Sequence, residues 1–145
     1  MVLRKLLRAE SLYYLSHWCY RKGWESMGHS LSALNKILNC CNINCKARIG
    51  PGLHISHAVG LVIGGRIKIG KDSKIYHNLT LGSNNGFCPV IGNKVTIYPH
   101  TIIAGNIIIP DNSVIPAKST LITKRSRIWD NNNKKLVLRK LLKSG

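Results

Sequence analysis

Acidic residues are scarce in this sequence. Of its 145 residues only five are aspartate or glutamate, against 22 lysines and arginines, so the formal net charge is +17. A field of this size attracts polyanions such as nucleic acid, anionic lipid, acidic glycan or the phosphates of a cofactor. Aromatic residues are also few, at 6%, and a basic surface without interleaved aromatics does not suit nucleic-acid binding. We therefore expect an anionic partner other than a nucleic acid.

Long apolar runs are missing as well. None approaches the roughly 20 residues that a membrane span requires, and the first residues show no apolar stretch followed by a small-residue cleavage site. The five cysteines are an odd number, and CNINC (Cys41–Cys45) has no second half that would complete a metal site. We predict a cytoplasmic protein with reduced thiols, no bound metal and no secretory signal.

The two ends of the chain share the hexapeptide VLRKLL, at Val2–Leu7 and at Val137–Leu142. The final 21 residues carry a net charge of +6. Basic residues that alternate with leucine at helical spacing suit a helix lying on an anionic membrane surface. The alternative is that both segments are amphipathic helices that pack on the core and leave their charges in water.

Aliphatic residues recur every six positions through the middle of the chain. An α-helix cannot maintain this period, because each step would rotate the stripe by about 240°. Short strands joined by turns at fixed intervals do maintain it, and three hexads then close one triangular coil. Two insertions interrupt the series, one of two residues after Ile55 and one of four residues after Leu81. The positions are Ile43, Ile49, Ile55, Ile63, Ile69, Ile75, Leu81, Ile91, Ile97, Ile103, Ile109, Ile115 and Leu121.

The preceding segment has a helical period instead. Leucines from Leu3 to Leu15 and Trp18 recur at helical spacing, Gly23 can end that helix, and a second helix is expected around Ser30–Leu38. We predict a helical cap over residues 1–42, a mainly β domain that is a parallel β-helix over 43–124, and a basic tail over 125–145. The cap would cover the open end of the first coil, as solenoids require.

The repeat segment resembles the hexapeptide-repeat acyltransferases, within them the serine acetyltransferase branch and its relatives in capsule, colanic acid and O-antigen synthesis. This resemblance implies a left-handed β-helix, a homotrimer, and acetyl-CoA bound in the groove between neighbouring subunits. The segments that carry it are IGPGLHISHAVGLVIGG (Ile49–Gly65), IYHNLTLG (Ile75–Gly82), CPVIGNKVTI (Cys88–Ile97) and IIAGNIIIPDNSVIPAKS (Ile102–Ser119).

His57 occupies the position of the family's catalytic base, two residues after the aliphatic Ile55. A hydroxyl that attacks a thioester needs a base, and neutral imidazole suits that role near neutral pH. The alternative is a surface histidine at a corner. His77 has the same offset one coil further on, so its ring should line the same groove. It could bind substrate, hold His57, or only stack against it.

Two departures from the serine acetyltransferase pattern influence the predicted acceptor. Where that branch has an aspartate paired with the base, this chain has Asn42, and where it has an aspartate directly before the base, this chain has Ser56. A free ammonium is best held by carboxylate. Cys88 before Pro89 replaces a histidine, as in relatives that act on polysaccharides. We therefore predict O-acetylation of a sugar hydroxyl in a surface glycan, with serine as the alternative acceptor.

The remaining site residues follow from the resemblance. The loop SNNGFCP (Ser83–Pro89) would fold over the groove, so Asn84, Asn85 and Cys88 join Ser56 and His77 as predicted substrate contacts. The closing segment of the family is replaced here by Arg127–Leu136. The predicted coenzyme contacts are Pro99, Gly105, Ala117, Lys118, Thr123 and Lys124.

One function of another class stays open, and a second is disfavoured by the spacing of the histidines. A non-catalytic hexapeptide-repeat scaffold would need the same prism and no base. A zinc enzyme of the carbonic anhydrase type also uses this prism, with three histidines converging across a subunit interface. The spacing of His57, His77 and His100 does not match that family. Binding of the coenzyme distinguishes the enzyme from the scaffold.

Overall fold

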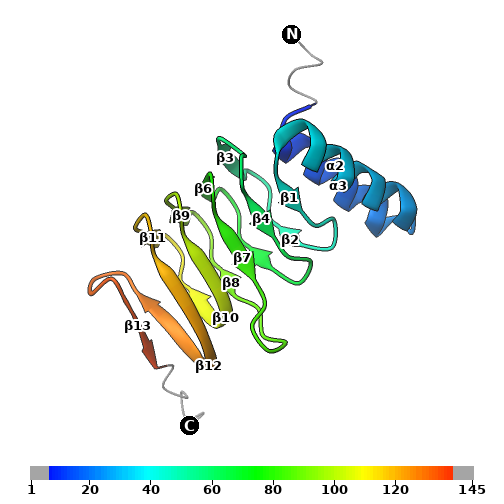
Figure 1. Ribbon diagram of the computed structural model, residues 1–145. Coiled ribbons are helices and arrows are strands. Elements are labelled where there is room, and N and C mark those ends of the chain that lie inside the picture. Colours follow the sequence, from blue (N-terminus) through cyan, green and yellow to red (C-terminus); the bar gives the residue numbers. More distant parts are fainter. Residues whose placement is uncertain (1–6, 139–145) are drawn as a thin grey trace.

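The computed structural model describes residues 7–138 as two helices followed by a stack of short strands (Figure 1). The helices are α2 (Ala9–Arg21) and α3 (Glu25–Asn39). The strands are β1 (Asn42–Ile43), β2 (Arg48–Ile49), β3 (His54–Ser56), β4 (Val62–Ile63), β5 (Lys68–Ile69), β6 (Lys74–Tyr76), β7 (Thr80–Gly82), β8 (Val90–Ile91), β9 (Thr96–Ile97), β10 (Ile102–Ile109), β11 (Val114–Ile115), β12 (Thr120–Asp130) and β13 (Lys135–Leu138).

The strands form a mainly β, parallel solenoid of about four turns, consistent with the predicted left-handed β-helix. Each coil adds one strand to each of three faces. The face β1–β4–β7–β10 and the face β2–β5–β8 belong to one sheet, because β10 runs through the corner between them. The third face is β3–β6–β9–β11. In Figure 1 the successive coils lie side by side from cyan to orange.

The hexad aliphatics fill the interior of the solenoid, as predicted. Twelve of the thirteen are buried, and Leu121, in the last of the series, is half-buried against the same core. The residue before each inward aliphatic points outward, as Asn42 does before Ile43 and Lys68 before Ile69. This alternation is the period of two that a strand imposes on its side chains.

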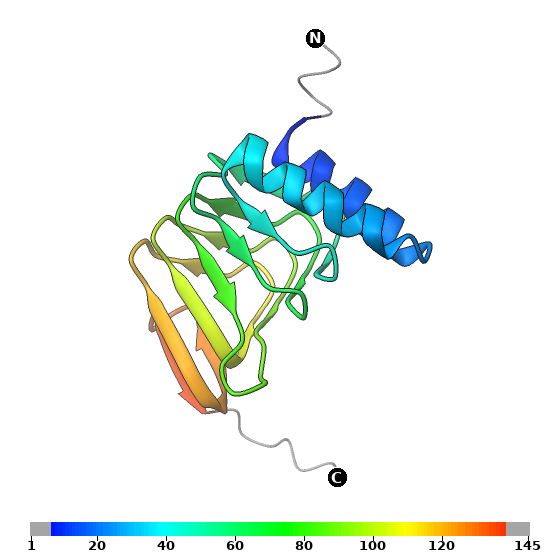
Figure 2. The same cartoon turned by 45° about the vertical axis from the view of Figure 1, so that its right-hand side comes forward.

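Helix α2 covers the open edge of the first coil (Figure 2). The phenol of Tyr13, which is fully buried, donates to the carbonyl of Ala47 at 2.9 Å and accepts from the backbone N–H of Ile49 at 3.1 Å. The phenol of Tyr14 likewise donates to the carbonyl of Gly50 at 2.6 Å and accepts from the backbone N–H of Leu53 at 3.3 Å. The first coil has no preceding coil to pair with, so these phenols supply partners that its backbone would otherwise lack.

The sequence predicts the two helices but not all of their contacts. Gly23 follows the first helix with φ +85°, as expected of a residue that ends a helix. The second helix begins at Glu25, earlier than predicted. Leu15 and Trp18, taken as part of one apolar stripe, are about half exposed, at 47% and 49%. The division of the chain at residues 42 and 124 stays a prediction.

The predicted basic tail is a β-hairpin over its described part. Strand β12 pairs in parallel with β10, and the chain then turns back so that β13 pairs antiparallel with β12, Trp129 opposite Leu136. Trp129 is buried and Leu136 packs against the core. The expectation of a helix at Val137–Leu142 is wrong for its first two residues, because the last coil would leave backbone groups unpaired and a strand satisfies them. The rest of that segment and residues 1–6 lie outside the described residues.

Candidate functional site

Three histidines form a row along one corner of the solenoid, where the β3–β6–β9–β11 face meets the β1–β4–β7–β10 face. His57 follows β3, His77 follows β6, and His100 lies in the turn after β9. The ring centroids of His57 and His77 are 6.2 Å apart at 74°, and those of His77 and His100 are 5.4 Å apart at 85°. The rings of His57 and His77 are neighbours in successive coils, as their shared offset in the hexad predicts. That they line a substrate groove stays a prediction.

The three rings differ in their access to solvent. His57 and His100 are exposed, whereas His77 is half-buried between them and its Nδ1 is buried without a hydrogen-bond partner. The carbonyl of His77 accepts from the backbone N–H of His100 at 3.4 Å. His57 therefore presents an accessible imidazole that can accept a proton. The ring of His77 packs edge-on against the ring of His57.

Asn42 and Ser56 lie close to this corner in the fold, but neither has a hydrogen bond to His57. Asn42 is exposed on β1, opposite Val62 in the neighbouring coil, and lines a cavity of about 350 Å³. The hydroxyl of Ser56 lies 3.2 Å from Nε2 of His54, with which it hydrogen-bonds. His54 is the first residue of β3 and is exposed.

The predicted substrate loop lies at a different corner from His57. It connects β7 to β8, and within it Asn84 and Phe87 exchange two backbone hydrogen bonds, at 2.9 and 3.1 Å. Asn85 and Gly86 form the tip with φ of +48° and +83°, the signs that a two-residue hairpin turn of type I′ needs. Cys88 leaves this hairpin half-buried and packs against the core.

The predicted coenzyme contacts divide between the same two corners. Pro99, Ala117 and Lys118 continue the histidine row, with the N–H of Lys118 donating to the carbonyl of Pro99 at 3.0 Å. Gly105 and Thr123 are register partners of β10 and β12 at the loop corner. Lys124 follows Thr123. Within one chain, the β1–β4–β7–β10 face separates the two groups.

One acidic residue near the histidine row has no signal in the sequence. The carboxylate of Glu10 on α2 accepts a hydrogen bond of 2.9 Å from the backbone N–H of Ile55, two residues before His57. It also lines a cavity of about 250 Å³ together with His54 and Ala58. Forty-five residues separate Glu10 from Ile55. Only the packing of α2 on the first coil brings them together.

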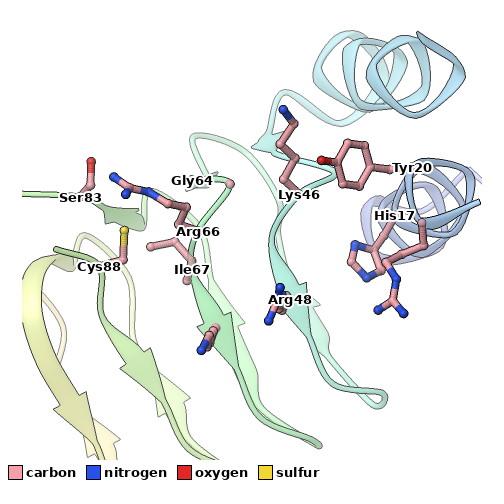
Figure 3. A pocket seen from close by; sticks show the side chains of 12 residues that line it. His17, Tyr20, Lys46, Arg48, Gly64, Arg66, Ile67, Ser83 and Cys88 are labelled. Carbon is pink, nitrogen blue, oxygen red and sulfur yellow. The ribbon is translucent and has the colours of Figure 1, made fainter. Parts of the chain in front are cut away.

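A second feature that the sequence did not indicate is a pocket of about 880 Å³ at the loop corner. Ser83 and Cys88 line one side of it, and His17 and Tyr20 of α2 line the other, with Arg48 between (Figure 3). Across residues 7–138 no three histidine, cysteine or acidic side chains are grouped so as to hold a metal ion. In that same stretch no helix has the length and apolarity needed to cross a membrane.

Known proteins resemble this chain in sequence and in fold. No family model matches the chain. The serine acetyltransferase of Helicobacter pylori (strain ATCC 700392 / 26695) is 32% identical to it over 115 residues, which cover 77% of this chain and 67% of that protein.

Solved structures agree in fold. Serine acetyltransferase isoform 3 from Entamoeba histolytica, in complex with cysteine, matches with a TM-score of 0.72 and 28% identity, over 83% of this chain and 45% of that one. A serine acetyltransferase in complex with CoA matches with a TM-score of 0.74 over 89% of this chain and 55% of that one, and at 24% identity this likeness shows the fold alone. The chain thus spans about half the length of these solved structures.

Proposed function

Because the chain belongs to the serine acetyltransferase family of hexapeptide-repeat acyltransferases, we propose that it transfers the acetyl group of acetyl-CoA to the hydroxyl of serine, with His57 as general base. The identity to a serine acetyltransferase over most of the chain supports this proposal best. The exposed ring of His57 on the shared prism agrees with it.

The prediction of a sugar hydroxyl as acceptor is wrong, because the relatives are serine acetyltransferases. The similarities to known proteins also do not show that the chain is closer in sequence to the acetyltransferases of surface polysaccharides than to other members of the family. The prediction rested on Asn42 and Ser56, which replace two carboxylates. An amide oxygen or a hydroxyl can still accept a hydrogen bond from an ammonium group. The missing charges therefore weaken the expected interaction with an amino acid without excluding it.

In the proposed reaction the serine hydroxyl attacks the thioester carbonyl carbon. As the new C–O bond forms, the neutral imidazole of His57 takes the hydroxyl proton, and when the C–S bond breaks the same proton passes to the leaving sulfur of CoA. No net proton is gained or lost, so one histidine acts first as base and then as acid. Ser56, Asn84, Asn85 and Cys88 stay proposed substrate contacts, and Asn42, at the position of the family's paired aspartate, is the proposed partner of the base. Of the roles open to His77, we propose that its ring positions the ring of His57.

We further propose that the active form is a homotrimer. The predicted residues lie at two corners of one chain, and a threefold arrangement can bring the His57 corner of one subunit against the loop corner of its neighbour. In that groove Lys118 and Lys124 would meet the phosphates of the coenzyme, since ammonium groups bind phosphate as point charges. Pro99, Gly105, Ala117 and Thr123 would contact the rest of the molecule. A cytoplasmic location and contact with an anionic membrane surface stay predictions.

The test is the appearance of free CoA thiol when the purified full-length chain is given acetyl-CoA and L-serine. We expect turnover that depends on serine and is lost in His57→Ala. A matched reaction with a hydroxylated sugar should show no more thiol than the background hydrolysis. A folded protein that binds acetyl-CoA and never acetylates serine would contradict the proposed acceptor. One that does not bind acetyl-CoA at all would favour the non-catalytic scaffold.

A further inference from the structure

The 880 Å³ pocket at the loop corner is walled by positive charge. Arg21 comes from α2, Lys46 and Arg48 from the first coil, and Arg66 and Lys68 from the second. None of the described acidic side chains lines the pocket. In Figure 3, Arg66 projects toward Ser83 on one side, and Lys46 lies by Tyr20 on the other.

Three of the five acidic residues accept hydrogen bonds elsewhere in the fold. Glu10, Asp111 and Asp130 each accept hydrogen bonds from backbone or side-chain amides away from the pocket. Of these basic residues, Lys46 has a ring contact, its Nζ lying 5.4 Å from the centroid of Tyr20. That contact leaves the positive charge in place. The pocket therefore carries a concentration of charge that the described part of the chain does not neutralise.

The stacking of coils places four of these cations in two rows, one row in each coil. The first coil carries Lys46 and Arg48, and the second carries Arg66 and Lys68. Arg48 on β2 and Lys68 on β5 are register partners in neighbouring strands, and both point outward and are exposed. Like charges directly opposite each other repel. Lys46 and Arg66 lie in the turns that precede these two strands. A ligand with neighbouring anionic groups would relieve the repulsion by lying across both rows.

We propose that this pocket binds a small soluble molecule that carries two or more phosphate groups. The volume lies within the range of small-molecule sites, and a cleft lined by one sign of charge concentrates ions of the other sign. The planar forks of Arg48 and Arg66 match phosphate oxygens two at a time. Linked phosphates supply several negative charges over a short length, as two adjacent rows of cations require. Within one chain the site lies at another corner from His57. In the proposed trimer this corner faces the His57 corner of a neighbouring subunit, so the ligand would lie beside the proposed acetyl-transfer groove, although its binding does not require acetyl transfer.

The test measures binding of inorganic pyrophosphate to the full-length chain by isothermal titration calorimetry at low and at physiological salt. The double variant Arg48→Gln/Lys68→Gln removes one cation from each row. Its control, Lys36→Gln/Arg125→Gln, makes the same change in net charge at two exposed positions outside the pocket. We expect wild-type affinity to fall at least tenfold in the pocket variant and less than twofold in the control, with circular dichroism unchanged in both.

Three results would overturn the proposal. The first is absence of pyrophosphate binding to the wild type at low salt. The second is an equal loss in the control, since that indicates a diffuse effect of net charge. The third is a loss in Lys118→Gln/Lys124→Gln with the pocket variant unaffected, because the phosphates would then bind at the proposed coenzyme contacts.

A lipid headgroup offers the same phosphate chemistry, and flotation with phosphatidylglycerol vesicles separates the two sources. A soluble ligand is supported if the pocket variant loses pyrophosphate binding while it floats with vesicles to the same extent as the wild type. Loss of flotation in the variant, together with a wild type that binds vesicles but not pyrophosphate, would show that the site serves a lipid and overturn the proposal.

Discussion

His77 lies edge-on to His57, with their ring centroids 6.2 Å apart and their planes at 74°. The edge-on geometry is a favoured arrangement of aromatic rings. His77 meets His100 in the same way, at 5.4 Å and 85°, so it is held from both sides. Its Nδ1 is buried without a partner. The contact of His77 with His57 is therefore one of ring packing, and this sets what each substitution in the row should do.

Replacing the proposed base should remove most activity. We expect His57→Ala to lower the rate of acetyl transfer by about 10²–10⁴-fold, the usual share of a positioned general base. His57 is exposed, so its loss should leave the core and the thermal midpoint unchanged. His54→Ala is the matched control, because His54 is also exposed and lies three residues away. Full activity in a folded His57→Ala protein, followed by thiol release from acetyl-CoA, would refute the assignment.

His77 should act through the position of His57. An aromatic pair contributes about 0.5–1.5 kcal/mol, so His77→Ala should lower kcat by at most about tenfold. His77→Phe keeps a ring and should retain most of the activity. The pH profile of kcat should be unchanged in both variants. A large loss in His77→Phe, or a displaced pH profile, would instead mean that a nitrogen of His77 contacts the substrate.

The oligomer should be a trimer with composite sites. Light scattering should give about three times 16.1 kDa, as expected for closed cyclic symmetry. A sharper measurement mixes His57→Ala subunits with subunits in which residues 84–87 are replaced by a Gly-Gly turn. Each alone should be inactive, whereas random mixing leaves about a quarter of the interfaces with both halves intact. No recovery after co-refolding would indicate that each subunit contains a complete site.

The phenol of Tyr13 should be important for stability. Tyr13→Phe leaves the carbonyl of Ala47 and the N–H of Ile49 buried without their partner. Leaving a buried polar group unsatisfied costs about 1–3 kcal/mol. We expect the free energy of unfolding in urea to fall by that amount. Tyr20→Phe, on the same helix, should change it by less than about 0.5 kcal/mol. Equal effects would mean that the cap is held by apolar contact alone.

Stability should fall at alkaline pH. Burial raises the pKa of Tyr13 above its ordinary value and raises the pKa of Cys41 to about 11. Both groups are neutral when protonated, so the folded state keeps protons that the unfolded chain releases. Their contribution is full below the ordinary pKa values and is lost as the pH rises through them toward the folded values. Urea unfolding should show a decline from about pH 9 upward, and a smaller one in Tyr13→Phe. A flat profile to pH 11 would contradict this.

The repeat determines the fold at the level of sequence. A six-residue period is compatible with one short strand and one turn per step. The aliphatic residue of each hexad from Ile43 to Ile115 could therefore be placed in the core before any contact was known. The pairing of His57 with His77 followed for the same reason, since the two share one offset in the hexad, whereas the place of His100 beside His77 did not follow from the sequence. These relations depend only on local geometry and on the stacking of identical coils.

The acceptor was a different kind of inference. It rested on two substitutions, Asn42 and Ser56, and on Cys88 before Pro89. Each of these side chains can still donate or accept a hydrogen bond, so none of them excludes serine. The relatives, which are serine acetyltransferases, contradicted the prediction of a sugar acceptor. The geometry of the prism is the same for either acceptor.

The sequence by itself therefore determined the solenoid, its core and the exposed corner that carries His57. Only the tertiary structure decided what covers the two ends and what gathers at the loop corner. The phenol of Tyr13 finds Ala47 because α2 crosses the first coil, and β13 finds β12 because the last coil leaves an edge to be paired. Arg21 and Arg66 line one pocket although they are far apart in the chain. These contacts join segments without a common period, so their formation depends on burial and unpaired backbone groups rather than on any local pattern.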